Sequence, residues 1–274
     1  MTQFSPSDWP QWALMWTMAV AIYVSCKWLT WQQAARSSPP PWKHASFLLA
    51  WPGMDATSFL GEGPMAECLP CRSREWFAAA GNLTFGVVLL FAMARIIPPQ
   101  HSYVVGWIGM IGIVLILHFG AFHLLSCLWR CAGLHARPLM NRPLASTSLS
   151  EFWGRRWNTA FRDVTHRFLF RPSASWLGPR WGTVVGFLFS GAVHELVISV
   201  PAHGGYGGPT VFFVIQGVAM VIERSRFGHQ MGLRNGWSGR LFTAAVLVAP
   251  VGLLFHRPFV VGVIVPFMRA LGAI

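Results

Sequence analysis

The sequence has 274 residues, of which 54% are hydrophobic and only 11% are charged. Soluble domains usually carry about 25% charged residues, so this composition excludes an ordinary water-soluble globular protein and indicates a chain that folds in lipid. The formal net charge of +12 would also suit a nucleic-acid-binding protein. No recognition motif accompanies the charge, however, and we expect no nucleic-acid partner.

Six apolar runs and a shorter seventh predict membrane-crossing helices, because a helical span needs about 17–25 mostly apolar residues. In chain order the runs are Trp12–Trp31, Trp76–Ile97, Tyr103–Trp129, Trp181–Val200, Thr210–Glu223, Leu241–Phe255 and Phe259–Ile274. The fifth and seventh are marginal, and either could be re-entrant. The first is too long for a cleavable signal peptide and is expected to be retained. We therefore predict an all-α polytopic membrane protein of about 6–8 transmembrane helices, forming one domain over residues 1–274.

Positive charges occur in every second connection between the apolar runs. The connections after the first, third and fifth runs carry Lys and Arg, whereas Pro98–Ser102 and Pro201–Pro209 carry neither. Positive residues favour the cytoplasmic side, so the N-terminus is expected outside and, with seven spans, the C-terminus inside. The expected location is the plasma membrane of a bacterium or, in a eukaryote, the endoplasmic reticulum.

The five cysteines do not suggest a disulfide framework. Cys68 and Cys71 form a CxxC in a loop that the charge pattern places in the cytoplasm, where thiols stay reduced. With Cys127 and Cys131 they could complete a four-sulfur zinc site. We favour unremarkable thiols near the membrane surface, and no bound metal.

The long basic connection contains an amphipathic segment, Ser146–Pro172. Ser148 or Ser150 could cap its start, and Pro172 is expected to end it. Its apolar stripe opposes Arg155, Arg162 and Arg167, which predicts a helix lying in the membrane interface. Simple anchoring would explain the stripe, but Asn158 beside it points to a further role.

The fourth run holds the pair His194-Glu195. An ionisable residue inside a spanning helix is costly unless it is paired or faces a wet cavity, so it marks a candidate functional site. Neighbouring residues point about 100° apart on a helix, so the two side chains cannot face one spot. His194 is expected to face a reaction chamber and Glu195 to pair elsewhere. A pair of satisfied structural polar groups is the alternative.

The segments LSEFWGRRWNTAFRDVTHRFLFRP and FLFSGAVHELV, followed by TVFFVIQGVAMVIE (Thr210–Glu223), resemble the membrane-bound O-acyltransferase superfamily. The similarity is greatest to its wax synthase-like branch, which carries an FWGRRWN block, a helix with SG-x-x-HE and an apolar helix ending in Glu. The motif region spans residues 142–226. The upstream segment WPGMDATSFL (Trp51–Leu60) resembles the same branch more weakly.

The resemblance implies transfer of a fatty acyl group from an acyl thioester, such as acyl-CoA, to the hydroxyl of a lipid alcohol, giving a wax ester or a related neutral lipid. No cofactor is required. The expected catalytic residues are His194, as general base, and Asn158, as hydrogen-bond donor. The other expected site residues are Glu195, Trp157 and Ser190, which position the substrates, and Arg155, Arg156 and Arg162, which bind phosphates of coenzyme A.

Some features depart from this pattern or leave alternatives open. The chain is compact, and Thr159-Ala160-Phe161-Arg162 stands where sterol and diacylglycerol acyltransferases have a second histidine soon after the WN pair. A polysaccharide or other polar hydroxyl is an alternative acceptor. A transporter and a haem or metal carrier using His118, His123 and His203 are alternatives of other classes.

Overall fold

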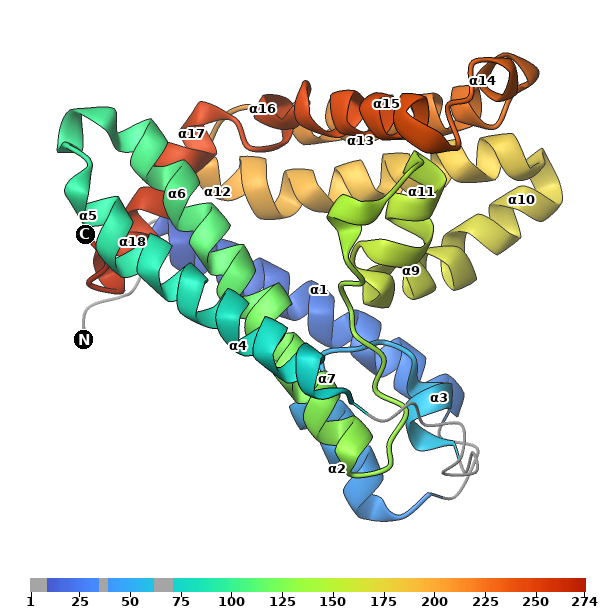
Figure 1. Ribbon diagram of the computed structural model, residues 1–274, viewed down its shortest axis with the longest axis horizontal. Helices are drawn as coiled ribbons and strands as arrows, with labels where there is room; N and C mark the ends of the chain where they lie inside the picture. Colours follow the sequence, from blue (N-terminus) through green and yellow to red (C-terminus); the bar gives the residue numbers. More distant parts are fainter. Residues whose placement is uncertain (1–8, 35–38, 62–70) are drawn as a thin grey trace.

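A computed structural model describes residues 9–34, 39–61 and 71–274, and every regular element in these ranges is helical (Figure 1). The N-terminal half contains α1 (Gln11–Ala34), α2 (Pro41–Ala50), α3 (Ala56–Leu60), α4 (Ser73–Val88), α5 (Ala94–Ile96), α6 (Ser102–Val114) and α7 (Phe122–Cys131). The C-terminal half contains α8 (Leu149–Glu151), α9 (Thr159–Thr165), α10 (Arg171–Leu177), α11 (Pro179–His194), α12 (Val200–Ala202), α13 (Gly208–Glu223), α14 (Arg226–Gln230), α15 (Gly236–Val248), α16 (Val251–Leu254), α17 (Arg257–Phe259) and α18 (Val265–Ala270). Several neighbours are joined without a break by π-helical turns, such as Glu195–Ser199 between α11 and α12.

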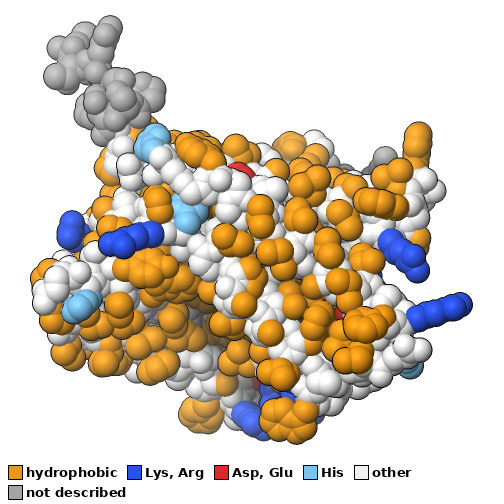
Figure 2. Space-filling model, turned by 90° about the horizontal axis from the view of Figure 1, so that it is seen from above, with side chains coloured by type: hydrophobic (Ala, Val, Ile, Leu, Met, Phe, Trp, Pro, Cys, Tyr) orange, Lys and Arg blue, Asp and Glu red, His pale blue; other side chains and the backbone are white. Residues whose placement is uncertain are grey.

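Five continuous helical stretches are long and apolar enough to cross a bilayer: Gln11–Ala34, Ser73–Ile96, Pro99–Cys131, Pro179–Ala202 and Gly236–Leu254. They correspond to the predicted first, second, third, fourth and sixth runs, and the predicted class of all-α polytopic membrane protein is confirmed. The fifth run forms the shorter α13. Figure 2 shows hydrophobic side chains over most of one face, with Lys and Arg gathered near its margins. Such a surface would be unstable in water and suits lipid.

The seventh run does not cross back to the opposite end of the molecule. Its helical part, Arg257–Ala270, is about 21 Å long at 1.5 Å per residue, too short for the roughly 30 Å hydrocarbon core. The ring of Phe267 packs 5.6 Å from that of Trp12, and Arg95 donates a hydrogen bond to the Ala273 carbonyl at 2.9 Å. The chain therefore ends beside the start of α1 and the end of α5 (Figure 1), so the structure does not support the seven-span expectation that the two termini lie on opposite sides of the membrane.

Two buried apolar clusters hold the helices together. The first joins α1, α6, α13 and the last helix through Met15, Val105, Phe212 and Val263. The second joins the end of α1 to the segment 47–60, the connection 134–139 and α9. In Figure 1, α3, α10 and α14 lie at the right-hand side, near the arginine-rich connections, and α5, α12 and α17 lie at the left. This placement agrees with the alternation of charge along the sequence.

The amphipathic segment is not the single helix that the sequence pattern predicts. Ser148 does cap its start, accepting a hydrogen bond from the Glu151 N–H at 3.0 Å. The helix then breaks because Trp157 is extended (φ −102°) and Asn158 is left-handed (φ 41°). Pro172 does not end it either: α10, which contains it, directly follows the π-helical turn His166–Phe170, the helix continues through Pro172, and the helix stops at Gly178 (φ 83°).

The position of the C-terminus can be tested by labelling introduced cysteines with a membrane-impermeant thiol reagent, in a background in which Cys26, Cys68 and Cys131 are replaced by serine. We expect Gln100→Cys and Ile274→Cys to react from the same side of sealed vesicles, and Arg234→Cys to react only from the other side. Labelling of Ile274→Cys and Arg234→Cys from one side would contradict the fold described above.

Candidate active site

His194 is held as a base by one main-chain contact. Its Nδ1 lies 2.7 Å from the carbonyl oxygen of Ser190, one turn earlier on α11. A carbonyl only accepts, so Nδ1 carries the proton, and in the neutral ring Nε2 keeps its lone pair. The ring lies against Phe213, with 4.4 Å between centroids. An imidazole in this tautomer can take a proton at Nε2.

Glu195 contacts a different residue from His194, as expected for neighbouring side chains that point about 100° apart on a helix. Its Oε1 accepts hydrogen bonds from the Thr210 N–H at 3.1 Å and from the Thr210 hydroxyl at 3.0 Å. Thr210 lies in the first turn of α13, where main-chain N–H groups lack helical partners and the helix dipole favours an anion. Glu195 therefore stabilises the start of α13.

Helix α13 carries side chains that touch both motifs. Phe213 contacts the His194 ring and also lies 5.8 Å, centroid to centroid, from Trp153 of the FWGRRWN block. Trp153 Nε1 donates to Gln216 Oε1 at 3.4 Å, and the fully buried Gln216 donates to the Val246 carbonyl at 2.9 Å. The two motifs thus meet across Phe213.

Asn158 lies at the break between the two amphipathic helices. Its Oδ1 accepts from the Phe161 N–H at 3.5 Å, as the N-cap of α9, which leaves the Nδ2 hydrogens available to another acceptor. Trp157 stacks on Phe152, with centroids 5.5 Å apart. Asn tolerates the left-handed conformation better than most residues, which suits it to this position.

The three predicted phosphate-binding arginines differ in their contacts. Arg156 donates two hydrogen bonds to Glu151 Oε1, from Nε (2.8 Å) and Nη2 (2.6 Å), and it also donates to two main-chain carbonyls. Partial burial raises the pKa of the Glu151 carboxyl, but hydrogen bonds from Thr147 and Arg156 bring it below its usual value, so it stays charged. Arg162 pairs with Asp163 at 2.9 Å. Arg155 is exposed, and it makes no hydrogen bond or ion pair within the described ranges.

Ser190 and Gly191 face different surroundings. The Ser190 hydroxyl donates to the Gly186 carbonyl at 3.0 Å, and its own carbonyl orients His194. At Gly191 a Cβ would lie 2.8 Å from Thr210 Cα, so only glycine allows α11 and α13 to approach this closely. The small residues of the SG-x-x-HE motif are therefore explained by helix packing.

The segment Trp51–Leu60 packs against α9, next to the candidate site. Buried Lys27 of α1 donates to the carbonyls of Trp51 (2.7 Å) and Gly53 (2.5 Å). The segment packs in the second apolar cluster with Ala160, two residues after Asn158. Its contribution is thus to the placement of α9.

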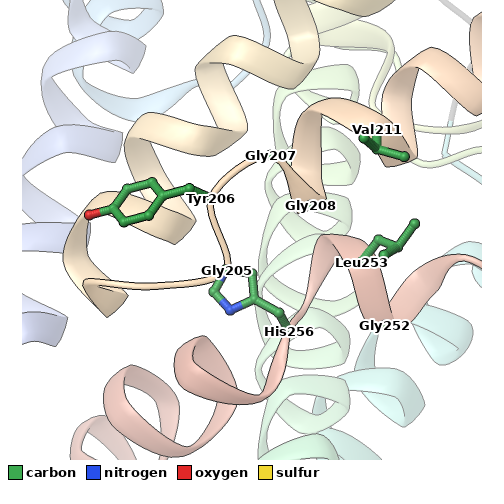
Figure 3. Close-up of a pocket in the computed structure, with 8 residues that line it drawn as sticks. All are labelled: Gly205, Tyr206, Gly207, Gly208, Val211, Gly252, Leu253 and His256. Carbon is green, nitrogen blue, oxygen red and sulfur yellow. The ribbon is translucent and has the colours of Figure 1, made fainter.

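A surface pocket lies beyond the C-terminal end of α11, after α12, and is lined by glycines of the loop before α13 and by His256 (Figure 3). His256 Nδ1 accepts from the Phe259 N–H, so Nε2 donates to the buried Ser199 hydroxyl at 3.2 Å. The lining residues are Gly205, Tyr206, Gly207, Gly208, Val211, Gly252, Leu253 and His256. They include neither His194 nor Asn158, so this pocket is distinct from the candidate site.

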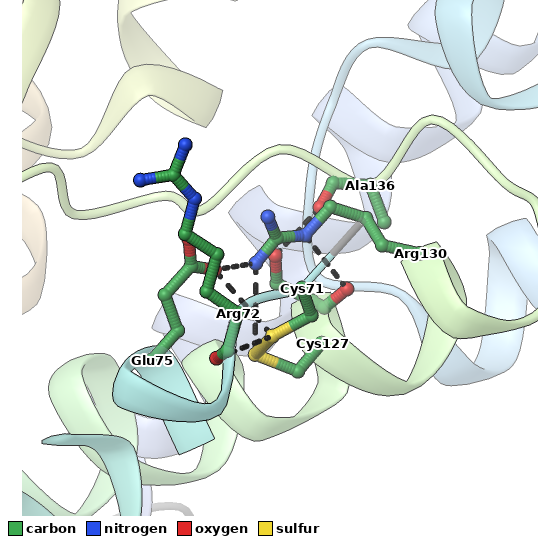
Figure 4. Close-up of a disulfide and its surroundings, with 7 residues drawn as sticks. Cys71, Arg72, Glu75, Cys127, Arg130 and Ala136 are labelled. Atoms are coloured by element: carbon green, nitrogen blue, oxygen red, sulfur yellow. Dashed lines mark hydrogen bonds and ion pairs between the residues drawn. A yellow bond between two sulfur atoms is a disulfide. The ribbon is translucent and has the colours of Figure 1, made fainter. Parts of the chain in front are cut away.

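Cys71 and Cys127 form a disulfide that joins the start of α4 to α7, with Cα atoms 5.2 Å apart (Figure 4). Arg130 forms an ion pair with Glu75 and lies 3.5 Å from the Cys127 sulfur. The expectation that these thiols stay reduced is wrong for this pair, because folding brings together two cysteines that are 56 residues apart. Cys131 is free, and Cys68 lies outside the described residues.

Few possible metal ligands lie close together in the described ranges. The one group of three that lie within reach of each other is Cys71, Glu75 and Cys127. His118 and His123 each keep one buried ring nitrogen without a hydrogen bond in this part of the chain, and they do not form such a group with His194 or His203.

Sequence reasoning missed three residues of α13: Phe213, Gln216 and Glu223. Glu223 was noted only as the end of a motif, yet it is fully buried and accepts two main-chain hydrogen bonds from α8. The signal was present, because a Gln and a Glu in an apolar run are as unusual as a His.

The fold and site define an integral membrane protein in which a half-buried histidine of a spanning helix contacts a short apolar helix. Residues 136–215, which include Asn158 and His194, match the model of the Membrane bound O-acyl transferase family. The predicted resemblance of the motif region to the membrane-bound O-acyltransferase superfamily is confirmed.

Similar curated proteins agree with the wax synthase-like branch. The chain is 32% identical over 141 residues to a "Probable long-chain-alcohol O-fatty-acyltransferase 9" of Arabidopsis thaliana, covering 47% of this chain and 41% of the relative. It is 32% identical over 128 residues to the "Long-chain-alcohol O-fatty-acyltransferase" of Simmondsia chinensis, covering 42% and 36%. An "Acyl-CoA--sterol O-acyltransferase 1" of Arabidopsis thaliana is 37% identical over 73 residues, covering 24% and 21%. The matches thus span less than half the length of these relatives, and no solved structure matches significantly.

The close approach of α11 and α13 can be tested with Gly191→Ala. The new methyl group would overlap the backbone of Thr210, so we expect it to destabilise the protein by about 1–3 kcal/mol. Thermal unfolding in detergent measures this loss. Gly81→Ala is the matched control, because a Cβ there meets nothing within 4 Å. Equal unfolding temperatures for the two variants would contradict the contact.

The disulfide can be tested by alkylation and mass spectrometry of the unfolded chain without reductant. We expect Cys26 and Cys131 to be alkylated, and Cys71 and Cys127 only after reduction, because the latter two share a covalent bond. Alkylation of all four cysteines before reduction would show that the pair is not bonded.

Proposed function

We propose that this protein transfers a fatty acyl group from an acyl thioester, most simply acyl-CoA, to the hydroxyl of a lipid alcohol. The observation that carries the proposal is the hydrogen bond from His194 Nδ1 to the Ser190 carbonyl, which leaves Nε2 as a base. The match to long-chain-alcohol acyltransferases supports the type of acceptor.

The reaction needs no covalent enzyme intermediate. His194 Nε2 takes the hydroxyl proton as the alcohol oxygen attacks the thioester carbonyl carbon. Asn158 Nδ2 donates a hydrogen bond to the carbonyl oxygen, where negative charge develops. The tetrahedral intermediate then collapses to the ester and a thiolate, which takes the proton back from His194. A site within lipid also limits hydrolysis of the thioester by water.

The contacts of the three arginines indicate which of them is free to bind a phosphate of the acyl donor. Arg155 is the best placed of the three to bind a phosphate, because Arg156 and Arg162 already have carboxylate partners. Guanidinium groups bind phosphate oxygens in a fork geometry. We place this arginine-rich side in the cytoplasm and the N-terminus outside, from the charge pattern. The membrane is the plasma membrane of a bacterium, or the endoplasmic reticulum in a eukaryote.

The test is ester formation by purified protein with a long-chain acyl-CoA and a panel of fatty alcohols, isoprenoid alcohols, sterols and diacylglycerol. We expect a long-chain alcohol ester, and loss of at least about 100-fold in kcat in His194→Ala, because a general base contributes about 10²–10⁴-fold. Activity that survives in a folded His194→Ala protein would refute the role of His194. Acylation only of a polar glycan would favour the alternative acceptor.

Asn158 is best tested with Asn158→Gly, which removes the amide but tolerates the left-handed backbone (φ 41°). We expect kcat to fall about 100-fold, the usual loss for one hydrogen-bond donor to a developing oxyanion. Arg142→Gly, at another left-handed position (φ 47°), is the control and should keep its kcat. Full activity of Asn158→Gly would show that Asn158 acts only as the cap of α9 and does not contribute to the reaction.

A further inference from the structure

Glu223 holds the start of the helix that carries the FWGRRWN block. Its side chain is fully buried, and Oε2 and Oε1 accept hydrogen bonds from the N–H groups of Leu149 (2.5 Å) and Ser150 (3.2 Å). These are among the first N–H groups of the helix, which lack partners within it. The carboxylate, which belongs to α13, thus caps the start of a different helix, in addition to the local cap that Ser148 supplies.

The same helix has a second attachment to α13. Its Trp153 donates to Gln216 and packs on Phe213, which touches His194. Attachments at its start and at its middle fix both the position and the rotation of Leu149–Arg156. That segment leads directly into Trp157 and Asn158.

The contacts link the three motifs in sequence. Glu195 of the SG-x-x-HE motif binds the start of α13, and Glu223 at the end of α13 binds the start of the FWGRRWN helix. Two carboxylates, one at each end of α13, therefore set where His194 and Asn158 lie relative to each other. A buried carboxylate is costly in an apolar protein, and its main partners here are main-chain groups rather than a surface cation. This cost is consistent with a carboxylate whose role is to fix the positions of these helices.

We propose that Glu223 is a positioning residue for acyl transfer: its carboxylate fixes the helix that presents Trp153 and Asn158 to the reacting groups at His194. The inference rests on the proposed function. Glu223 lies beyond the matched family region, which ends at residue 215, and it does not touch the reacting atoms.

The test is Glu223→Gln, which keeps the volume but gives one N–H of α8 a donor in place of an acceptor. We expect kcat to fall about 10- to 100-fold, the range for a small misplacement of catalytic groups, with KM for acyl-CoA changed less than about threefold. The double variant with Asn158→Gly should be little slower than Asn158→Gly alone, because Glu223 acts through that segment. Independent, multiplying losses would overturn the proposal.

Arg224→Met is the matched control. Arg224 follows Glu223 and donates from its side chain to the Ser150 hydroxyl at 2.9 Å, without touching the main-chain cap. We expect it to keep the wild-type kcat. An equal loss in Arg224→Met would mean that any disturbance of this contact slows the enzyme, and Glu223 would have no special role.

Hydrogen–deuterium exchange separates this inference from the proposed function. In Glu223→Gln, amides of the peptide 146–158 should exchange at least about tenfold faster, and those of α15 should not change. Unchanged exchange in 146–158 would overturn the anchor, whatever the activity. Faster exchange in a protein that esterifies no alcohol would retain the anchor and refute the acyltransferase proposal instead.

Discussion

The contact between the Glu195 carboxylate and the first turn of α13 is the one on which the site depends. Inside a bilayer no water satisfies a free N–H or a charged oxygen, so each must find a partner in the protein. The first turn of α13 packs beside Gly191, and the partner for its Thr210 N–H comes from α11. Glu195 supplies it, and α13 can then place Phe213 against His194.

This arrangement explains why a histidine and a glutamate stand side by side in an apolar helix. They make different contacts with the same neighbouring helix: the His194 ring lies against Phe213 of α13, and Glu195 accepts hydrogen bonds from Thr210 in the first turn of α13. The π-helical turn Glu195–Ser199 begins at the glutamate. Such turns interrupt the helical hydrogen-bond ladder, and they often occur at functional sites, where they redirect side chains.

The sequence was sufficient to predict five spanning helices and to single out His194 as an unusual residue in one of them. Runs of apolar residues have a direct physical meaning in lipid, and His194 stands out in its run. The break at Trp157-Asn158 was not predictable, because the apolar periodicity continues across it and only the extended backbone of Trp157 and the left-handed backbone of Asn158 interrupt the helix. Long-range pairs such as Glu223 with Leu149, or Cys71 with Cys127, depend on which helices become neighbours, and local patterns carry no such information.

The disulfide and the charge pattern place opposite demands on the same end of the molecule. The charge pattern predicts a cytoplasmic location for that end, where a disulfide is normally reduced. The surrounding contacts reconcile the two, because they hold the same segments without the bond: Arg130 pairs with Glu75 of α4, and the Ser126 hydroxyl donates to the Ala136 carbonyl at 2.6 Å. Arg130 would also stabilise a Cys127 thiolate, 3.5 Å away, once the bond is broken. The connection 134–142, which follows α7, is bonded to both sides of Asn158: the Thr159 N–H donates to the Leu139 carbonyl, and the Asn141 N–H donates to the Arg156 carbonyl. The position of Asn158 therefore depends on α7 in either redox state.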